Sequence, residues 1–128
     1  MRRVLALTVA ALGVVAVVGA VAVAHEKRYK TKKVRITAVT EQSFSGKVKA
    51  RGGCNVDRIV KVKRLEEYGG GSEPLGTART DTAGLWTLTL NEPVTPGTYK
   101  AVANRTSVEH EDELHKCKKG RSKLVQVG

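Results

Sequence analysis

The stretch that decides the fold is TDTAGLWTLTL, residues 80–90. Its first half has the composition of a tight turn, in which Asp81 accepts backbone N–H bonds and Gly84 takes the positive φ that closes the loop. Its second half alternates apolar and polar residues, so that Trp86 and the leucines two and four positions later lie on one side of an extended chain. The stretch therefore predicts a turn followed by a β-strand with one buried face.

The same alternation recurs in short runs on both sides of this stretch. Connections rich in glycine and proline separate the runs, and a glycine run at residues 69–71 is predicted as a hairpin loop. The pattern predicts seven strands, at residues 34–40, 43–50, 57–65, 76–80, 85–90, 98–104 and 122–127. Strands with one apolar face bury it best when two sheets pack together, so the expected fold is all-β, a small β-sandwich over residues 34–128.

Several of these strand and turn segments together resemble a known type of domain. They are FSGKV at 44–48, Cys54 with RIVKV at 58–62, the run from Gly76 to TDTAGLW at 80–86, GTYKA at 97–101, and Cys117 with Ser122 and the last strand. Over about residues 43–127 the chain resembles small exported bacterial domains of the carboxypeptidase regulatory-like, or prealbumin-like (transthyretin-like), type. The resemblance implies an immunoglobulin-like sandwich in which the Thr-Asp-x-x-Gly-x-Trp turn joins two strands and buries the aromatic.

The resemblance implies a modest function. Such domains are generally non-catalytic and serve as spacers, surface display modules or regulatory additions to other proteins, so no functional residue carries over. Trp86, the only tryptophan, has two interpretations. An exposed tryptophan would be a platform for stacking carbohydrate, but Trp86 keeps the phase of the buried apolar residues, so we predict that it lies in the core.

The first 24 residues are predicted to direct the chain out of the cytoplasm. Arg2 and Arg3 precede an apolar run over residues 4–24 that ends in the small-residue sequence Ala-Val-Ala. This is the pattern of a signal peptide cut after Ala24. The run is also long enough to cross a bilayer, and as an uncleaved anchor it would be the chain's one contact with the membrane. Positive charges directly behind it oppose its translocation.

A dense basic cluster follows the apolar run, made of Lys27, Arg28, Lys30, Lys32, Lys33 and Arg35. Residues 25–33 contain almost nothing to bury, so they are predicted to be a flexible basic arm that could bind polyanions. Without Arg2 and Arg3, the chain keeps 21 Lys and Arg against 12 Asp and Glu, a formal charge of 21 − 12 = +9. Such a surface favours anionic cell-envelope polymers or other surface proteins as partners, and solubility is the alternative explanation.

The two cysteines, Cys54 and Cys117, stand near the two ends of the folded region. An even number of cysteines in a small exported domain predicts a disulfide, whereas a metal site needs more ligands at closer spacing. A reactive thiol pair would more often be close in sequence. We therefore expect a Cys54–Cys117 disulfide and a secreted or cell-surface protein.

The three histidines define the alternative function, an exported copper-binding β-sandwich. Cleavage after Ala24 makes His25 the N-terminus, whose α-amine and imidazole chelate copper, and His110 and His115 could complete the site. The surroundings of His25 are strongly cationic, which disfavours a cation. A zinc peptidase is excluded because His110 and His115 are five residues apart, not the four that place two ligands on one helix face. Residues 107–116 are instead predicted to be a solvated loop.

Enzymatic function has no starting point in this sequence. The carboxylates form no isolated pair in an apolar setting, and the serines lack a nucleophile elbow. The charge suits nucleic acid, but the few aromatic residues are mostly in core phase, so no specific nucleic-acid recognition is expected. We therefore expect a non-catalytic module without a cofactor, with a structural or adhesive role at the cell surface or outside the cell.

Overall fold

The computed structural model describes residues 26–67 and 70–128, and within them the chain forms eleven β-strands. They are β1 (Glu26–Tyr29), β2 (Thr31–Val39), β3 (Ser43–Ala50), β4 (Ile59–Leu65), β5 (Ser72–Arg79), β6 (Leu85–Thr89), β7 (Gly97–Ala103), β8 (Thr106–His110), β9 (Glu113–Cys117), β10 (Gly120–Arg121) and β11 (Val125–Val127). The expected all-β class is confirmed. None of the described residues belongs to a helix with the length and apolar character needed to cross a membrane. The predicted signal or anchor, residues 1–24, lies outside the described residues.

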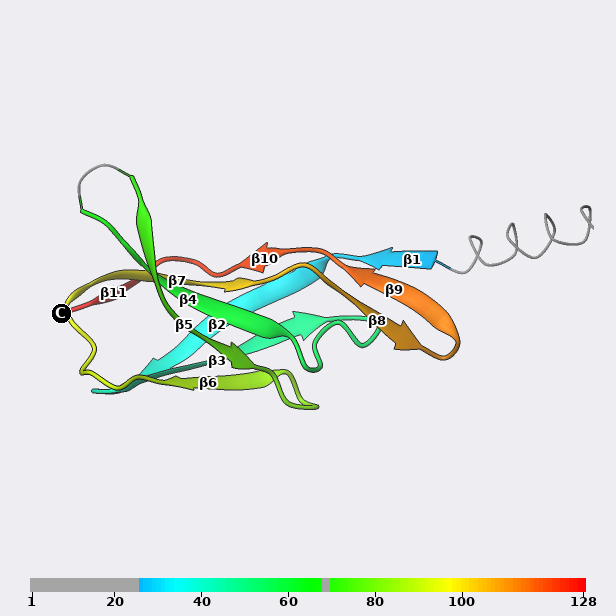
Figure 1. Ribbon diagram of the computed structural model, residues 1–128, viewed down its shortest axis with the longest axis horizontal. Helices are drawn as coiled ribbons and strands as arrows, with labels where there is room; N and C mark the ends of the chain where they lie inside the picture. Colours follow the sequence, from blue (N-terminus) through cyan, green and yellow to red (C-terminus); the bar gives the residue numbers. More distant parts are fainter. Residues whose placement is uncertain (1–25, 68–69) are drawn as a thin grey trace, which may run out of the picture.

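The core lies between two sheets (Figure 1). One sheet has the strand order β2-β3-β6, and the other has the order β10-β7-β4-β5, with β11 also paired to β7. Phe44 of β3 and Tyr99 of β7 meet between them, with ring centroids 5.0 Å apart. In the described part of the chain a further sheet, β1-β9-β8, lies at the end of the molecule opposite the C-terminus.

The TDTAGLW turn carries the chain from β5 in one sheet to β6 in the other. Asp81 Oδ1 accepts hydrogen bonds from the backbone N–H groups of Ala83, at 2.8 Å, and Leu85, at 2.9 Å. Gly84 has a φ of 81°, which favours glycine. Trp86 follows directly and is only 2% exposed. The predicted turn and the predicted core position of Trp86 are both confirmed.

A glycine on the neighbouring strand makes room for the indole ring. Gly46 of β3 stands opposite Trp86 of β6 in the register. A Cβ atom on Gly46 would overlap both the indole ring and the carbonyl oxygen of Arg35. Any larger residue at position 46 would therefore force β2 or the indole ring out of place.

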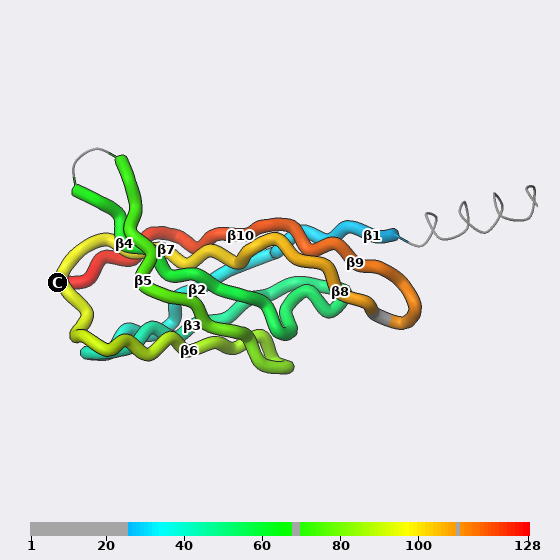
Figure 2. The backbone as a smooth tube through the Cα atoms, in the orientation of Figure 1, coloured from blue at the N-terminus to red at the C-terminus, as the bar shows by residue number. Residues whose placement is uncertain are grey.

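The N-terminal arm is the first correction to the sequence prediction. Residues 26–29 form β1, which pairs in parallel with β9, and residues 31–39 form β2, which pairs with β3. Residues 26–33 are therefore not an arm outside the β domain, and Figure 2 shows the chain passing through them from the β8–β9 end into the β2–β3–β6 layer. The partner of β1 lies at residues 114–117, so local composition does not reveal it.

Residues 107–116, predicted to be a loop, are the second correction. They lie in a hairpin of β8 and β9, in which His110 stands opposite Glu113. The connecting residues Glu111 and Asp112 have φ values of 52° and 64°. Positive φ at both central residues is the geometry of a tight hairpin turn, which sequences usually mark with asparagine or glycine. Because this turn has neither residue, the sequence pattern did not reveal it.

The predicted disulfide between Cys54 and Cys117 is present. It joins residues 63 positions apart in the sequence, and both cysteines are fully buried. The bond connects the segment between β3 and β4 to the last residue of β9, and so fastens the end sheet to the rest of the domain. A structural disulfide is typical of proteins in an oxidising environment outside the cytoplasm.

Arg58, directly before β4, is a buried charge that the sequence pattern did not indicate. It is fully buried, and its guanidinium donates to the carbonyl oxygens of Cys54 (2.7 Å), Asn104 (2.8 Å) and Lys118 (3.2 Å), and to the Thr31 hydroxyl (3.1 Å). Burial lowers the pKa of the guanidinium. Backbone carbonyls take the place of a counter-ion here, so Arg58 holds four separate segments together.

Arg58→Lys is expected to lower the free energy of unfolding by about 1–3 kcal/mol, because one ammonium group cannot span the acceptors that the guanidinium reaches. Urea unfolding followed by circular dichroism measures the change. Arg79→Lys is the matched control, since exposed Arg79 contacts only Asp57 among the described charged residues, in a surface ion pair of 3.1 Å, whose loss costs under about 1 kcal/mol. Equal losses in the two variants would contradict this role of Arg58.

Candidate polyanion-binding face

Four cationic side chains gather on the outer surface of the β2–β3–β6 sheet. Buried residues alternate with exposed cations on two strands, which places Lys33 and Arg35 of β2 and Lys47 and Lys49 of β3 on the solvent side. The register sets Lys33 opposite Lys49 and Arg35 opposite Lys47. We call these four residues the basic face. They line a surface hollow of about 150 Å³.

The basic face is held together against electrostatic repulsion. Both cross-strand pairs bring like charges directly opposite each other, which typically destabilises a sheet by up to about 1 kcal/mol per pair. The strands β2, β3 and β6 contain no Asp or Glu. Within residues 26–67 and 70–128, none of the four side chains forms an ion pair. A bound anion would therefore relieve a repulsion that the protein itself leaves uncompensated.

Protection of a sheet edge explains only part of the basic face. β2 is the edge strand of its sheet, and lysines on an edge discourage pairing with other chains. β3 is the central strand and pairs with β2 on one side and β6 on the other, so it has no free edge. Lys47 and Lys49 on β3 are therefore not needed for edge protection.

The structure separates the first part of the sequence-predicted basic cluster from the basic face. Lys27 Nζ lies 3.2 Å from Glu113 Oε2, and Arg28 Nε lies 3.8 Å from Glu26 Oε1. The hydrogen bond between Lys27 and Glu113 raises the pKa of the lysine and lowers the pKa of the carboxyl group. Lys30 is exposed between β1 and β2. Lys27 and Arg28 are thus partly neutralised by the fold itself.

The second part of the predicted cluster, Lys32, Lys33 and Arg35, lies on β2. The structure adds Lys47 and Lys49, which the sequence analysis placed in a strand but did not identify as site residues. The spacing of Lys47 and Lys49 in the sequence could have identified them. Two strands joined by a short turn usually pair as a hairpin, and alternate residues of both then share one face. The lysines two positions apart in the second strand could therefore have been assigned to the same surface.

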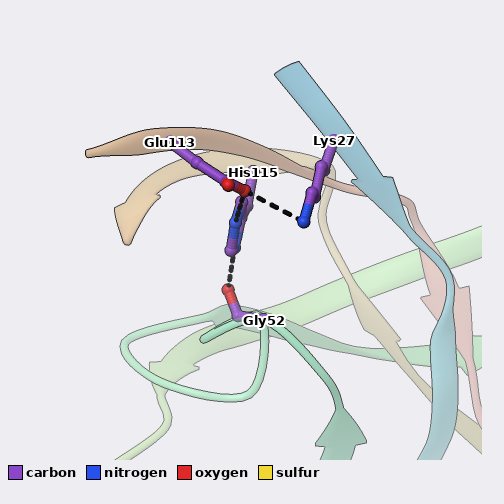
Figure 3. Close-up of polar contacts among 4 residues, drawn as sticks. All are labelled: Lys27, Gly52, Glu113 and His115. Atoms are coloured by element: carbon purple, nitrogen blue, oxygen red, sulfur yellow. Dashed lines mark hydrogen bonds and ion pairs between the residues drawn. The ribbon is translucent and has the colours of Figure 1, made fainter. Parts of the chain in front are cut away.

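His115 of β9 is buried, and Figure 3 shows it between Glu113 and Gly52. Its Nδ1 donates a hydrogen bond to the carbonyl oxygen of Gly52 at 2.7 Å. Its Nε2 lies 3.3 Å from Glu113 Oε2, the same oxygen that contacts Lys27. The ring of Tyr29 packs against the imidazole with centroids 4.8 Å apart. Both ring nitrogens thus face polar partners, and the imidazole connects the Gly52 loop to β9.

The described contacts do not bring the histidines predicted for copper binding together in one site. His25 lies outside the described residues, and His110 is in β8. His115 is buried with both ring nitrogens engaged. Among the side chains that the structure describes, no group of three or more His, Cys, Asp and Glu is placed to hold a metal ion. Copper binding through His25 stays a prediction of the sequence alone.

Comparisons with protein-family models, with curated proteins and with solved structures find no match to this chain. The carboxypeptidase regulatory-like resemblance therefore stays a prediction from turn and strand motifs. Function is inferred from the charges, burial and register of the described residues.

Proposed function

We propose that this protein is an exported, non-catalytic module that binds anionic polymers through the basic face and acts as a structural or adhesive element at the cell surface or outside the cell. The observation that carries the proposal is the pair of like-charged contacts, Lys33 with Lys49 and Arg35 with Lys47, on a sheet without acidic residues. A polyanion supplies the missing negative charge. The domain itself is proposed to be an immunoglobulin-like or prealbumin-like sandwich.

The geometry of the face suits a repeating anion better than a single small one. The paired strands place the Cβ atoms of the four basic residues about 5 Å apart across the sheet and about 7 Å apart along it. The neighbouring residues of β6 on this side of the sheet, such as Thr87, are exposed. A linear polymer can contact several cations at once, so its affinity rises with the number of charges engaged.

Export is supported by two independent features of the chain. The Cys54–Cys117 disulfide fits an oxidising compartment, and residues 1–24 have the pattern of a signal peptide or anchor. Anionic polymers of the cell envelope are the polyanions that a cationic exported domain would meet. Cell-surface or secreted localisation is therefore part of the proposal.

The double variant Lys47→Gln/Lys49→Gln is expected to weaken binding to long-chain inorganic polyphosphate by about tenfold at low salt, since each surface cation near a polyanion contributes about 1 kcal/mol or less. Titration of the full chain by fluorescence anisotropy at several salt concentrations measures this. Binding should also weaken steeply with salt, because exposed charges are screened beyond about 8 Å at physiological ionic strength.

Lys118→Gln/Lys119→Gln is the matched control for this experiment. It removes the same charge from two exposed lysines between β9 and β10, outside the β2–β3–β6 sheet. If net charge alone drives binding, both double variants will lose affinity equally, and the proposed role of the basic face is then wrong.

A further inference from the structure

A second feature of the molecule is the groove beside β2, which shares Lys33 and Arg35 with the basic face but extends to the other sheet. It has a volume of about 540 Å³ and is lined on one side by residues 32–36 of β2 and on the other by residues 121–125 of the β10–β11 segment. β2 is the edge of one sheet, and β10 and β11 are at the edge of the other. The groove therefore lies along an open side of the domain, where the two sheets do not join.

The two edges meet at one end of the groove and separate beyond it. Thr31 Oγ1 donates a hydrogen bond to the carbonyl oxygen of Lys118 at 2.6 Å, and a Cβ on Gly120 would press on Thr31 and Val34. Further along, the chain turns toward β7, because Ser122 donates its N–H to the Ala101 carbonyl and accepts the Ala101 N–H on its hydroxyl, both at 2.8 Å. Because Ser122 bonds to β7, residues 121–125 do not pair with β2, and a groove remains between them.

An uncovered edge strand offers backbone hydrogen bonds to another chain. In an antiparallel pair, every second residue points its N–H and C=O groups away from the partner strand. β2 pairs with β3 alone among the strands that the structure describes, so these groups of β2 face the groove. An extended peptide can bind there by adding a strand to the sheet.

The side chains around the groove define the chemistry of such a peptide. On β2, Lys33 and Arg35 point to one side of the sheet, and Val34 and Ile36 point to the other. Exposed cations also stand across the groove, and Leu124 there is 59% exposed. Val34 is buried in the core, and Ile36 is half-buried. A strand paired to β2 would place alternate residues beside the cations and beside this aliphatic row, at Ile36 in particular. A peptide in which acidic and aliphatic residues alternate would place its carboxylates beside the cations and its aliphatic side chains beside those of β2.

We infer that the edge of β2 binds an extended segment of another protein in which acidic and aliphatic residues alternate. The inference goes beyond polymer binding, because it uses the backbone of β2 together with Arg121, Lys123 and Leu124, which are not part of the basic face. The five cations of the groove, with no carboxylate among its lining residues, repel basic strands. An acidic strand turns the same cations into attractive contacts.

The probe is an eight-residue peptide of alternating glutamate and valine, titrated against the full chain by fluorescence anisotropy. Its control is a peptide of the same composition with four glutamates followed by four valines. The alternating peptide should bind about tenfold more tightly, since it alone can satisfy both rows of side chains. It should also slow amide hydrogen exchange at alternate residues of the segment 33–36, which reports hydrogen bonding to the edge. Equal affinity for the two peptides would overturn the inference.

Two variants separate this inference from polymer binding. Arg121→Gln/Lys123→Gln should weaken the alternating peptide by about tenfold, at about 1 kcal/mol or less for each cation, and leave polyphosphate binding largely unchanged. Lys47→Gln/Lys49→Gln should weaken polyphosphate binding and leave binding of the alternating peptide largely unchanged. Slowed exchange of the same amides by anionic phospholipid vesicles, without an effect of the peptide, would assign the groove to an amphiphile and also overturn the inference.

Discussion

Trp86→Ala is expected to lower the free energy of unfolding by about 3–5 kcal/mol, the usual loss when a buried aromatic side chain is truncated. Such a loss is a large share of the total stability of a small domain, which is about 5–15 kcal/mol. Trp86 is 2% exposed and belongs to the cluster that joins the two facing sheets. Its Nε1 has no hydrogen-bond partner among the described residues, so the loss comes from packing alone. Urea unfolding followed by circular dichroism measures it.

Two further variants give this measurement its controls. Leu85→Ala alters the adjacent residue of the same strand, whose side chain is 49% exposed, and should cost about 1 kcal/mol or less. Trp86→Phe keeps most of the apolar contact and should fold even if the alanine variant does not. An alanine variant that unfolds like the parent protein, but no longer binds carbohydrate, would make Trp86 a binding residue and refute its core role.

Removal of the disulfide by Cys54→Ala/Cys117→Ala is expected to cost about 4 kcal/mol, because a covalent link across a loop this long strongly restricts the unfolded chain. The linked residues are 63 positions apart and fully buried. Chemical unfolding of the variant and of the unreduced protein gives the difference. A second readout is local, since Cys117 stands opposite Tyr29 in the register of β1 and β9. Amide exchange in β1 should therefore speed up in the variant.

Thiol counting provides the independent check on this prediction. The unreduced, naturally produced protein should show no thiol that reacts with a chromogenic disulfide reagent in denaturant, and the reduced protein should show both. Two reactive thiols before reduction, or a loss of stability below about 1 kcal/mol, would contradict a stabilising role for the bond.

The sequence predicted best those parts of the fold that local chemistry determines. Asp81 and Gly84 mark a turn by their own backbone preferences, and the alternation that follows places Trp86 inside. The strand predicted at residues 43–50 has the observed bounds, and those predicted at 85–90 and 98–104 differ from β6 and β7 by a single residue at one or both ends. Strands with regular alternation between clear turns are recognisable because one face must be buried.

The parts that were missed depend on distant partners. β1 consists of Glu26–Tyr29 and is a strand only because β9 lies beside it, so its charged composition resembles that of an unstructured arm. The burial of Arg58 depends on the carbonyl groups of Cys54, of Asn104 after β7 and of Lys118 after β9. An arginine beside a strand is normally exposed. No pattern of neighbouring residues distinguishes it from the surface cations.

The candidate site was predicted in part, for a related reason. The cluster named from the sequence includes Lys33 and Arg35, which do belong to the basic face. It also includes Lys27 of β1, which forms an ion pair with Glu113 of β9. Charge density along the chain therefore identified the right region but not which cations remain free. For Lys27, that depends on where β9 places the carboxylate of Glu113.

The parallel pairing of β1 with β9 has a mechanical consequence. A pull on the two ends of the described chain would load β1 along its length, so its hydrogen bonds to β9 would be sheared together rather than opened one by one. Behind this shear contact, the Cys54–Cys117 bond closes a segment 63 positions long. At about 3.4 Å per residue, that segment would be roughly 200 Å long if fully extended, and the disulfide prevents this extension. Under tension only residues 26–53 and 118–128 of the described chain could lengthen.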